Sequence, residues 1–152
     1  MRNLTDEEAA EIVEALAALE AYASGLAATK ATKDDVVRLQ SILEAMRECD
    51  TNGDLAGVSE QNELLHAAIV EVAAHNTIGG LVMSLNAQNV RYQFRTILHT
   101  GRPGHWPGHS IPEHEAIVEA IARGDSEAAS AAMATHLGNV SAALRSAVRT
   151  TA

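Results

Sequence analysis

The chain has 152 residues, the usual size of one domain, and that length is enough to bury a sizeable core. Its formal net charge of −9 excludes the broad basic face with which free-standing domains bind nucleic acid. Cys49 is the only cysteine, so no disulfide forms within the chain, and no apolar run approaches the length of a membrane helix. We therefore expect a cytoplasmic protein without a membrane segment.

Alanine-rich composition favours helix, and helix-start signals place the first two helices. Thr5 and Glu8 form a predicted capping box, which is followed by an apolar stripe at helical spacing: Ile12, Leu16, Leu19, Ala23 and Leu26. A second helix is predicted to begin after Thr32, and its stripe consists of Val36, Leu39, Leu43 and Met46. The sequence Thr51-Asn52-Gly53 is typical of the turn that follows.

Four further helices complete an all-helical prediction. We expect helices at about 54–75 and 77–100, and then a glycine- and proline-rich loop at 101–108. Ser110 and Glu113 form a second predicted capping box before a helix that ends at Gly124. Asp125 caps a last helix that runs to about residue 148. No segment shows a strand pattern or a repeat, so residues 1–152 are expected to form one all-α domain.

Polar residues interrupt the apolar helix stripes at four positions: Asn62, His66, His114 and His136. Asn62 and His66 are spaced i, i+4 and therefore share one helix face. His114 and His136 lie about equally far from the predicted turn between the last two helices, so they are expected at nearly the same height across that hairpin. We expect all four side chains to point inward.

This set of residues suits a divalent metal ion. Neutral imidazoles bind first-row ions well, with Zn²⁺ the first choice and Ni²⁺ or Mn²⁺ as alternatives. Asn62 offers only a neutral amide oxygen, so the ion would keep its positive charge and attract an anion or a water molecule to its open positions.

Two other interpretations stay open at this point. The histidines are consistent with a metal-free interaction bundle in which buried rings are hydrogen-bonded. They are also consistent with a helical metalloenzyme that activates a water molecule. Glu63 and His66 form an E-x-x-H motif, but a di-iron bundle needs two such motifs and the chain has one. We therefore predict that the protein is not an enzyme.

The predicted helix at 77–100 and the loop that follows it contain further candidate residues. Arg91 and Arg95 form an i, i+4 basic pair that belongs either to a solvated face or to a clamp for an effector carboxylate. His99, His105 and His109 flank or occupy the glycine- and proline-rich loop and are expected to be exposed. Trp106 lies in the same loop.

The C-terminal third carries a family resemblance. The segment from His114 to Asp125, followed by Met133 and His136-Leu137, resembles the C-terminal signature of the FCD domain, the effector-binding half of many GntR-type bacterial transcription regulators. Three upstream stretches are similar to other elements of that family: Leu19-Glu20, Asn62-Glu63-Leu64-Leu65-His66 and His75-Asn76.

The resemblance implies an antiparallel bundle of about six or seven helices around a central cavity for metal and effector. It implies that Asn62, His66, His114 and His136 hold the metal, that the effector is a small organic acid, and that the protein is a homodimer. DNA would be bound only through a helix-turn-helix domain, and the chain contains no recognisable element of that kind. The sequence departs from the family pattern at Asn62, where Asp is frequent, and at Leu16, where Arg is common.

Overall fold

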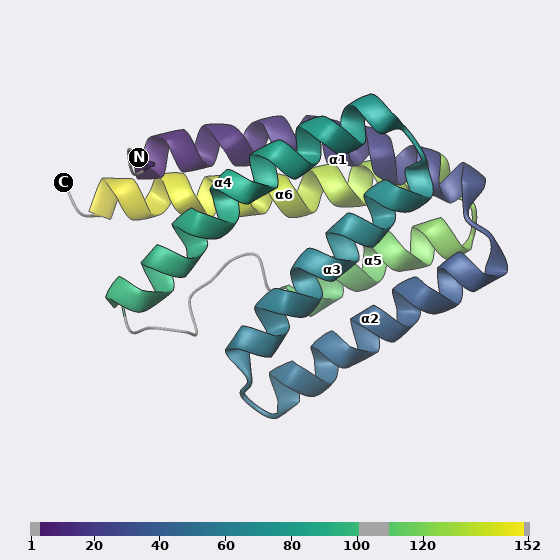
Figure 1. Ribbon diagram of the computed structural model, residues 1–152, viewed down its shortest axis with the longest axis horizontal. Helices are drawn as coiled ribbons and strands as arrows, with labels where there is room; N and C mark the ends of the chain where they lie inside the picture. Colours follow the sequence, from purple (N-terminus) through teal and green to yellow (C-terminus); the bar gives the residue numbers. More distant parts are fainter. Residues whose placement is uncertain (1–3, 101–109, 151–152) are drawn as a thin grey trace.

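The computed structural model describes residues 4–100 and 110–150, with side chains described for 4–89 and 110–146. Within these ranges the chain forms six helices and no strand (Figure 1), which confirms the all-α prediction. The helices are α1 (Asp6–Lys30), α2 (Lys33–Thr51), α3 (Leu55–Ala73), α4 (Asn76–Thr100), α5 (Ile111–Ala122) and α6 (Ser126–Thr150).

Capping boxes fix the starts of the first two helices. The hydroxyl of Thr5 accepts a hydrogen bond from the Glu8 amide at 3.1 Å, and the Thr5 amide donates to the Glu8 carboxylate at 2.9 Å. Thr32 and Asp35 repeat this arrangement at the start of α2. The backbone amide of Thr32 donates a hydrogen bond to the Asp35 carboxylate, and this bond holds the pKa of Asp35 below its ordinary value because it stabilises the charged form. The Thr5 capping box and the start of a helix after Thr32 were predicted from the sequence, whereas the return hydrogen bond to Asp35 was not.

The start of α5 differs from its predicted capping box. Ser110 accepts a hydrogen bond from the amide of Glu113 at 3.3 Å, as expected. However, the carboxylate of Glu113 does not return to the Ser110 amide. It accepts hydrogen bonds from His136 and Asn139 of α6 instead, at 3.2 and 2.6 Å. The side chain that local sequence assigned to a cap is thus used in a contact between helices.

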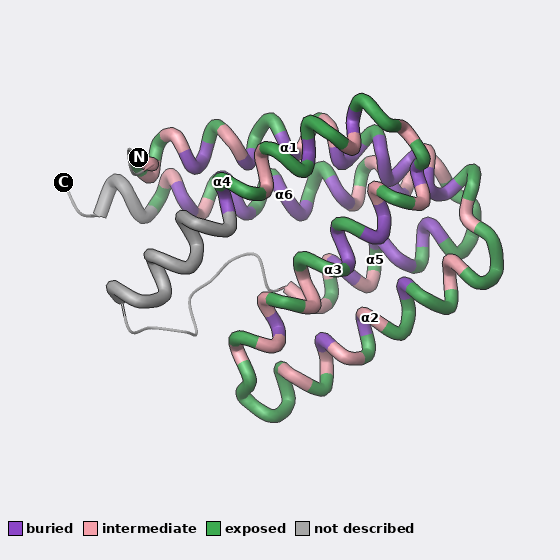
Figure 2. Tube along the Cα trace, in the orientation of Figure 1, coloured by how far each residue is buried: buried purple, intermediate pink, exposed green. Residues whose placement is uncertain are grey.

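The most extensive contact among the described helices is between the first and the last of them. α1 and α6 lie side by side and antiparallel, with the chain termini at the same end of the bundle (Figure 1). α2 and α3 form a hairpin, α2 also packs against α5, and α4 crosses α1. Figure 2 shows that the buried residues of α1, α3, α5 and α6 face one shared interior.

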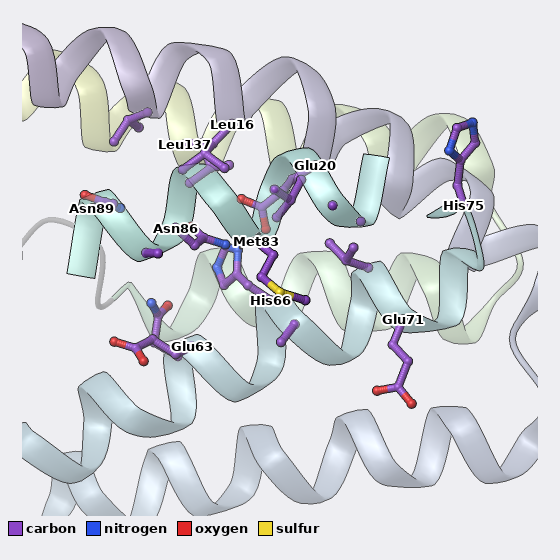
Figure 3. Close-up of a pocket in the computed structure, with 18 of the residues that line it drawn as sticks. Leu16, Glu20, Glu63, His66, Glu71, His75, Met83, Asn86, Asn89 and Leu137 are labelled. Atoms are coloured by element: carbon purple, nitrogen blue, oxygen red, sulfur yellow. Dashed lines mark hydrogen bonds and ion pairs between the residues drawn. The ribbon is translucent and has the colours of Figure 1, made fainter. Parts of the chain in front are cut away.

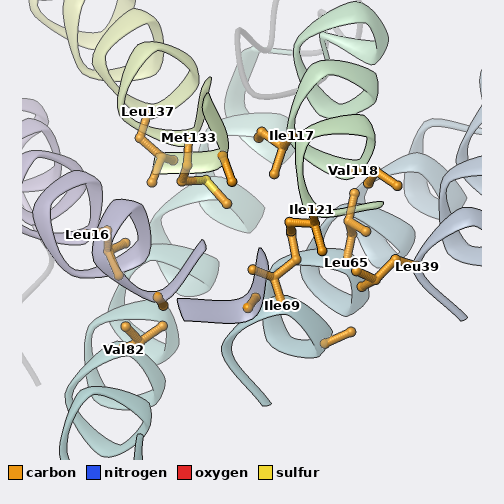
Figure 4. Packing of buried hydrophobic residues seen from close by; sticks show 14 of the residues in the cluster. Leu16, Leu39, Leu65, Ile69, Val82, Ile117, Val118, Ile121, Met133 and Leu137 are labelled. Carbon is orange, nitrogen blue, oxygen red and sulfur yellow. The ribbon is translucent and has the colours of Figure 1, made fainter. Parts of the chain in front are cut away.

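That interior is filled by branched and small apolar side chains. Leu65 and Ile69 of α3, Ile117 and Ile121 of α5, and Met133 of α6 are almost completely buried (Figure 4). Each of these pairs is spaced i, i+4, which places both members on the same helix face. This face is also the one that carries the histidines into the bundle.

The buried stripe of α1 is rotated from its predicted position. Ile12 and Leu19 are half-buried, whereas Val13, Leu16 and Glu20 are buried. α1 is also long and apolar enough, by length and composition alone, to cross a membrane. Half of its most apolar window is buried inside the bundle, where it contributes to the core.

Two glycines allow α5 and α6 to reach α1. Gly124 has φ +70° at the turn between α5 and α6, a conformation that residues with a Cβ rarely adopt. Gly25 of α1 lies against the start of α6, where the Ser126 hydroxyl donates a hydrogen bond to the Gly25 carbonyl at 2.9 Å. A Cβ on Gly25 would lie 3.1 Å from Oγ and 3.3 Å from the backbone oxygen of Ser126. The close contact between α1 and α6 therefore needs glycine.

We expect Gly25→Val to lower the free energy of unfolding by roughly 1–3 kcal/mol, because the added carbons overpack the α1–α6 contact. Chemical denaturation measures the change. Gly138→Val is the matched control, since a Cβ on Gly138 meets no atom within 4 Å. Equal destabilisation by both substitutions would contradict the close-contact explanation and indicate a general effect of valine in a helix.

Candidate metal centre and adjoining cavity

Three imidazole rings from three different helices meet in the interior. His66 of α3, His114 of α5 and His136 of α6 are all buried. The ring centroids are 5.5 Å apart for His66 and His114, 5.4 Å for His66 and His136, and 4.3 Å for His114 and His136. One nitrogen from each ring lies within 4.8 Å of the other two. The structure therefore brings together the three histidines that the sequence singled out.

The outer nitrogens of two rings are held by acceptors. Nδ1 of His114 lies 2.7 Å from the carbonyl oxygen of Ser110, one turn earlier on the chain. A carbonyl oxygen can only accept, so Nδ1 of His114 carries the proton. Nδ1 of His66 lies 2.9 Å from the carboxylate of Glu20, whose side chain is 1% exposed. This buried carboxylate on α1 fixes the orientation of the His66 ring.

The third ring has a carboxylate behind it as well. Nδ1 of His136 lies 3.2 Å from Oε1 of Glu113, and the other oxygen of Glu113 accepts a hydrogen bond from Asn139 at 2.6 Å. A carboxylate or carbonyl behind a ligating histidine is the usual outer partner in metal sites, because it fixes the ring and raises its basicity. All three rings have such a partner.

The Nε2 atoms of His66 and His114 lie 3.4 Å apart. If His66 carries a second proton beside Glu20, its Nε2 donates that proton to Nε2 of His114. If both rings are neutral with the proton on Nδ1, the two Nε2 lone pairs face each other, and a metal ion between them would take the place of the proton. Two Zn–N bonds of about 2.0–2.1 Å at a tetrahedral angle separate their nitrogens by about 3.3 Å, so the observed spacing fits a shared metal ion.

The ring of His136 is kept neutral by its surroundings. Burial, together with the neighbouring His66, lowers the pKa of His136 to about 4, while the hydrogen bond to Glu113 partly opposes the shift. The ring is therefore neutral near neutral pH, and its contact with the Glu113 carboxylate places its one proton on Nδ1. A metal ion that binds there displaces no proton from this residue.

Asn62 contributes a polar atom without a protein partner. It lies one turn before His66 on α3, and its Oδ1 is buried and accepts no hydrogen bond in the described part of the chain. Buried side-chain oxygens are almost always paired, so this oxygen is available to a water molecule or a bound ion. Asn62 lines the same cavity as His66 and His136, which makes its amide oxygen a candidate fourth ligand.

A cavity of about 880 Å³ adjoins the histidines. His66, His136, Glu20 and Asn62 form part of its wall, and residues from α1, α3, α4 and α6 form the rest. Figure 3 shows Glu20 of α1, His66 of α3, and Met83 and Asn86 of α4 around this space. The volume lies in the range of small-molecule binding sites.

The remaining predicted site residues lie outside the residues whose side chains are described. Arg91 and Arg95 belong to α4, of which only the backbone is described at those positions. The same holds for His99, while Trp106 and both loop histidines, His105 and His109, fall in the undescribed segment 101–109. The clamp that Arg91 and Arg95 were predicted to form stays a prediction.

Sequence reasoning missed the two carboxylates, although a signal existed for each. Glu20 lies i, i+4 from Leu16 and therefore belongs to the buried stripe of α1. Glu113 and His136 lie about equally far from the hairpin turn, so the height argument applied to His114 applies to Glu113 too. Glu113 was instead interpreted as part of a helix cap.

The FCD domain family matches residues 11–139, and the chain belongs to this family. It is similar to the HTH-type transcriptional regulator LutR of Bacillus subtilis (strain 168), with 28% identity over 137 residues that cover 88% of this chain and 61% of the relative. The chain thus spans about three fifths of that regulator's length. The family resemblance predicted from the sequence is confirmed.

Two solved structures share the fold. E. coli McbR/YncC aligns with a TM-score of 0.79 and 20% identity, over 93% of this chain and 66% of that protein. Streptococcus agalactiae GntR aligns with a TM-score of 0.72 and 19% identity, over 88% of this chain and 58% of that protein. At these identities the likeness shows the fold alone, and it agrees with the predicted antiparallel bundle.

We expect the metal-free protein to lose stability as the pH falls from about 6.5 to about 4, the interval between the ordinary pKa of histidine and that of folded His136. In this interval the unfolded chain binds a proton that the folded chain does not, so the linkage favours unfolding. Denaturation in chelator across this range measures the slope. His136→Gln should remove part of it, and an unchanged slope in that variant would contradict the assignment.

We expect Glu20→Gln to weaken metal binding by about 10–100-fold, because an amide is a poorer acceptor for the Nδ1 proton of His66. Titration against a metal-binding dye measures the affinity. Glu63→Gln is the matched control, since Glu63 also lies on the cavity wall but is exposed. Equal losses in both variants would indicate a general charge effect rather than positioning of His66.

Proposed function

We propose that this domain is the metal-dependent effector sensor of a GntR-type bacterial transcription regulator. A divalent ion would be held by His66, His114 and His136, with Asn62 as the fourth ligand. The observation that carries the proposal is the buried cluster of His66, His114 and His136, in which one nitrogen of each ring lies within 4.8 Å of the other two while each Nδ1 faces an acceptor. We propose Zn²⁺, with Ni²⁺ and Mn²⁺ as alternatives.

The effector is proposed to be a small carboxylate. The metal, when bound, supplies a Lewis-acidic position for a carboxylate oxygen, and the adjoining cavity accommodates the rest of the molecule. Glu20 and Glu113 neutralise much of the ion's charge from behind the rings. The site would therefore select the effector by coordination rather than by a large positive field. Arg91 and Arg95 are proposed as further contacts.

We propose sensing rather than catalysis for this site. A hydrolytic metal site needs a general base that faces the bound water molecule. Glu20 and Glu113 are held against the outer nitrogens of His66 and His136, so both carboxylates are engaged behind the rings. The curated relative is named as a regulator, which agrees with this interpretation.

The regulator is proposed to act in the cytoplasm as a homodimer. DNA would be contacted by a helix-turn-helix domain that lies outside these 152 residues. The net charge of −9 supports this division of labour, because an acidic domain repels the phosphate backbone. Metal and effector would then alter how the paired DNA-binding domains are held.

We expect His114→Ala to abolish stoichiometric metal content and the thermal stabilisation that metal confers. A ligand at about 1,000 times its Kd stabilises by roughly 4 kcal/mol, which corresponds to roughly 10 °C in Tm for a domain of this size. Elemental analysis and melting with and without chelator give both readouts. His75→Ala is the control, because His75 lies on the cavity wall outside the cluster. Wild-type protein without metal, or with a chelator-insensitive Tm, would support a metal-free bundle.

A further inference from the structure

The carboxylate of Glu113 stands between two sets of hydrogen-bond donors. One set is local: the backbone amide of Glu113 already donates to the Ser110 hydroxyl at 3.3 Å, and a bond from the Ser110 amide to the Glu113 carboxylate would complete a capping box. The other set belongs to α6, where His136 and Asn139 contact one carboxylate oxygen each. In this structure the carboxylate is with α6.

The chain itself shows what an acidic residue at this position of a helix does otherwise. At the start of α1 the Glu8 carboxylate accepts a hydrogen bond from the Thr5 amide at 2.9 Å, and at the start of α2 the Asp35 carboxylate accepts one from the Thr32 amide at 2.9 Å. Both carboxylates close their capping boxes. The start of α5 differs because a neighbouring helix presents competing donors to Glu113.

Asn139 is the closer of the two competing donors. Its Nδ2 lies 2.6 Å from Oε2 of Glu113, whereas Nδ1 of His136 lies 3.2 Å from Oε1. Hydrogen bonds from nitrogen to a charged oxygen are usually about 2.7–2.9 Å long, so the contact with Asn139 is a tight one and the contact with His136 is a loose one. The amide of Asn139 therefore contributes most to holding the carboxylate on α6.

Asn139 acts from the surface on a group in the interior. It is exposed and lies three residues after His136, so the two side chains share a face of α6. The side chain of Glu113 between them is 22% exposed, and that of His136 is 1% exposed. Asn139 belongs neither to the histidine cluster nor to the cavity wall, so it can affect that ring only through Glu113.

The position of Glu113 decides where the proton of His136 lies. With the carboxylate behind the ring, the proton stays on Nδ1 and Nε2 keeps the lone pair that a metal ion needs. Without that acceptor, a proton on Nδ1 has no partner in a buried place, and the proton moves to Nε2. It would then have to leave before an ion could bind.

We propose that Asn139 is a positioning residue of the candidate metal centre. Its amide holds Glu113 away from the cap of α5 and against His136, and thereby sets which nitrogen of that ring carries the proton. The consequence for metal affinity rests on the proposed function. The placement of the proton does not, because it is a property of the metal-free protein as well.

Two substitutions at this exposed position remove the donor without disturbing the core. Asn139→Asp keeps the shape of the side chain but puts a second carboxylate beside Glu113, and Asn139→Ala removes the amide without adding charge. In both variants the ring ¹⁵N spectrum of metal-free protein near neutral pH is expected to show His136 shifting from the Nδ1–H to the Nε2–H form. The Ser110 amide should exchange more slowly with solvent, because Glu113 then caps it.

Zinc affinity, measured by titration against a metal-binding dye, is expected to fall about tenfold in both variants. An added carboxylate by itself attracts a cation, so a loss in Asn139→Asp has the opposite sign to a simple charge effect. Gln88→Glu is the matched control: it makes the same change from amide to carboxylate at an exposed residue of α4 that does not line the cavity. This variant should leave the His136 spectrum and the zinc affinity unchanged.

The outcomes separate the positioning role from the function of the site. An unchanged His136 spectrum in both Asn139 variants would overturn the inference, whatever happens to zinc affinity. Equal losses of affinity in Asn139→Asp and Gln88→Glu would overturn the effect of Asn139 on the metal. A shifted spectrum in the variants of a protein whose wild type binds no zinc would overturn the proposed function and leave the role of Asn139 in placing Glu113 intact.

Discussion

The hydrogen bonds to the outer nitrogens of the three histidines are the constraint on which the interior depends. Each ring is oriented so that its Nδ1 faces an acceptor. For His66 and His136 the acceptor is a carboxylate on another helix, and for His114 it is a backbone carbonyl four residues earlier in the chain. This arrangement turns the remaining nitrogens toward one another, where they can share a proton or surround a cation.

This arrangement links stability with ligand binding. The centre joins α3, α5 and α6 directly and reaches α1 through Glu20. A metal ion would therefore tie together four of the six helices, and an effector at the metal would contact α4 across the cavity. Because Glu20, His66 and His136 also line the cavity, a molecule that coordinated the proposed ion would contact the surfaces between helices. Such contacts would let a small ligand shift how the helices pack.

The two carboxylates change the electrostatic interpretation drawn from the ligands alone. Three imidazoles and an amide leave a divalent ion with its full charge, which would attract any anion. Glu20 and Glu113 place negative charge directly behind two of the rings and so reduce that attraction. For the proposed effector, selectivity would then depend on the shape and polarity of the cavity as well as on the ion.

The sequence alone determined the helical class, the first capping box and the three histidines, because these follow from local periodicity and from polar residues on apolar stripes. It placed His114 and His136 at one height because a short hairpin turn fixes their register. Only the tertiary structure decided that Glu113 turns from its own helix cap to His136, and that the α1 stripe rotates to bury Glu20 beside His66. Those choices depend on contacts between residues 23 and 46 positions apart, which no local pattern encodes.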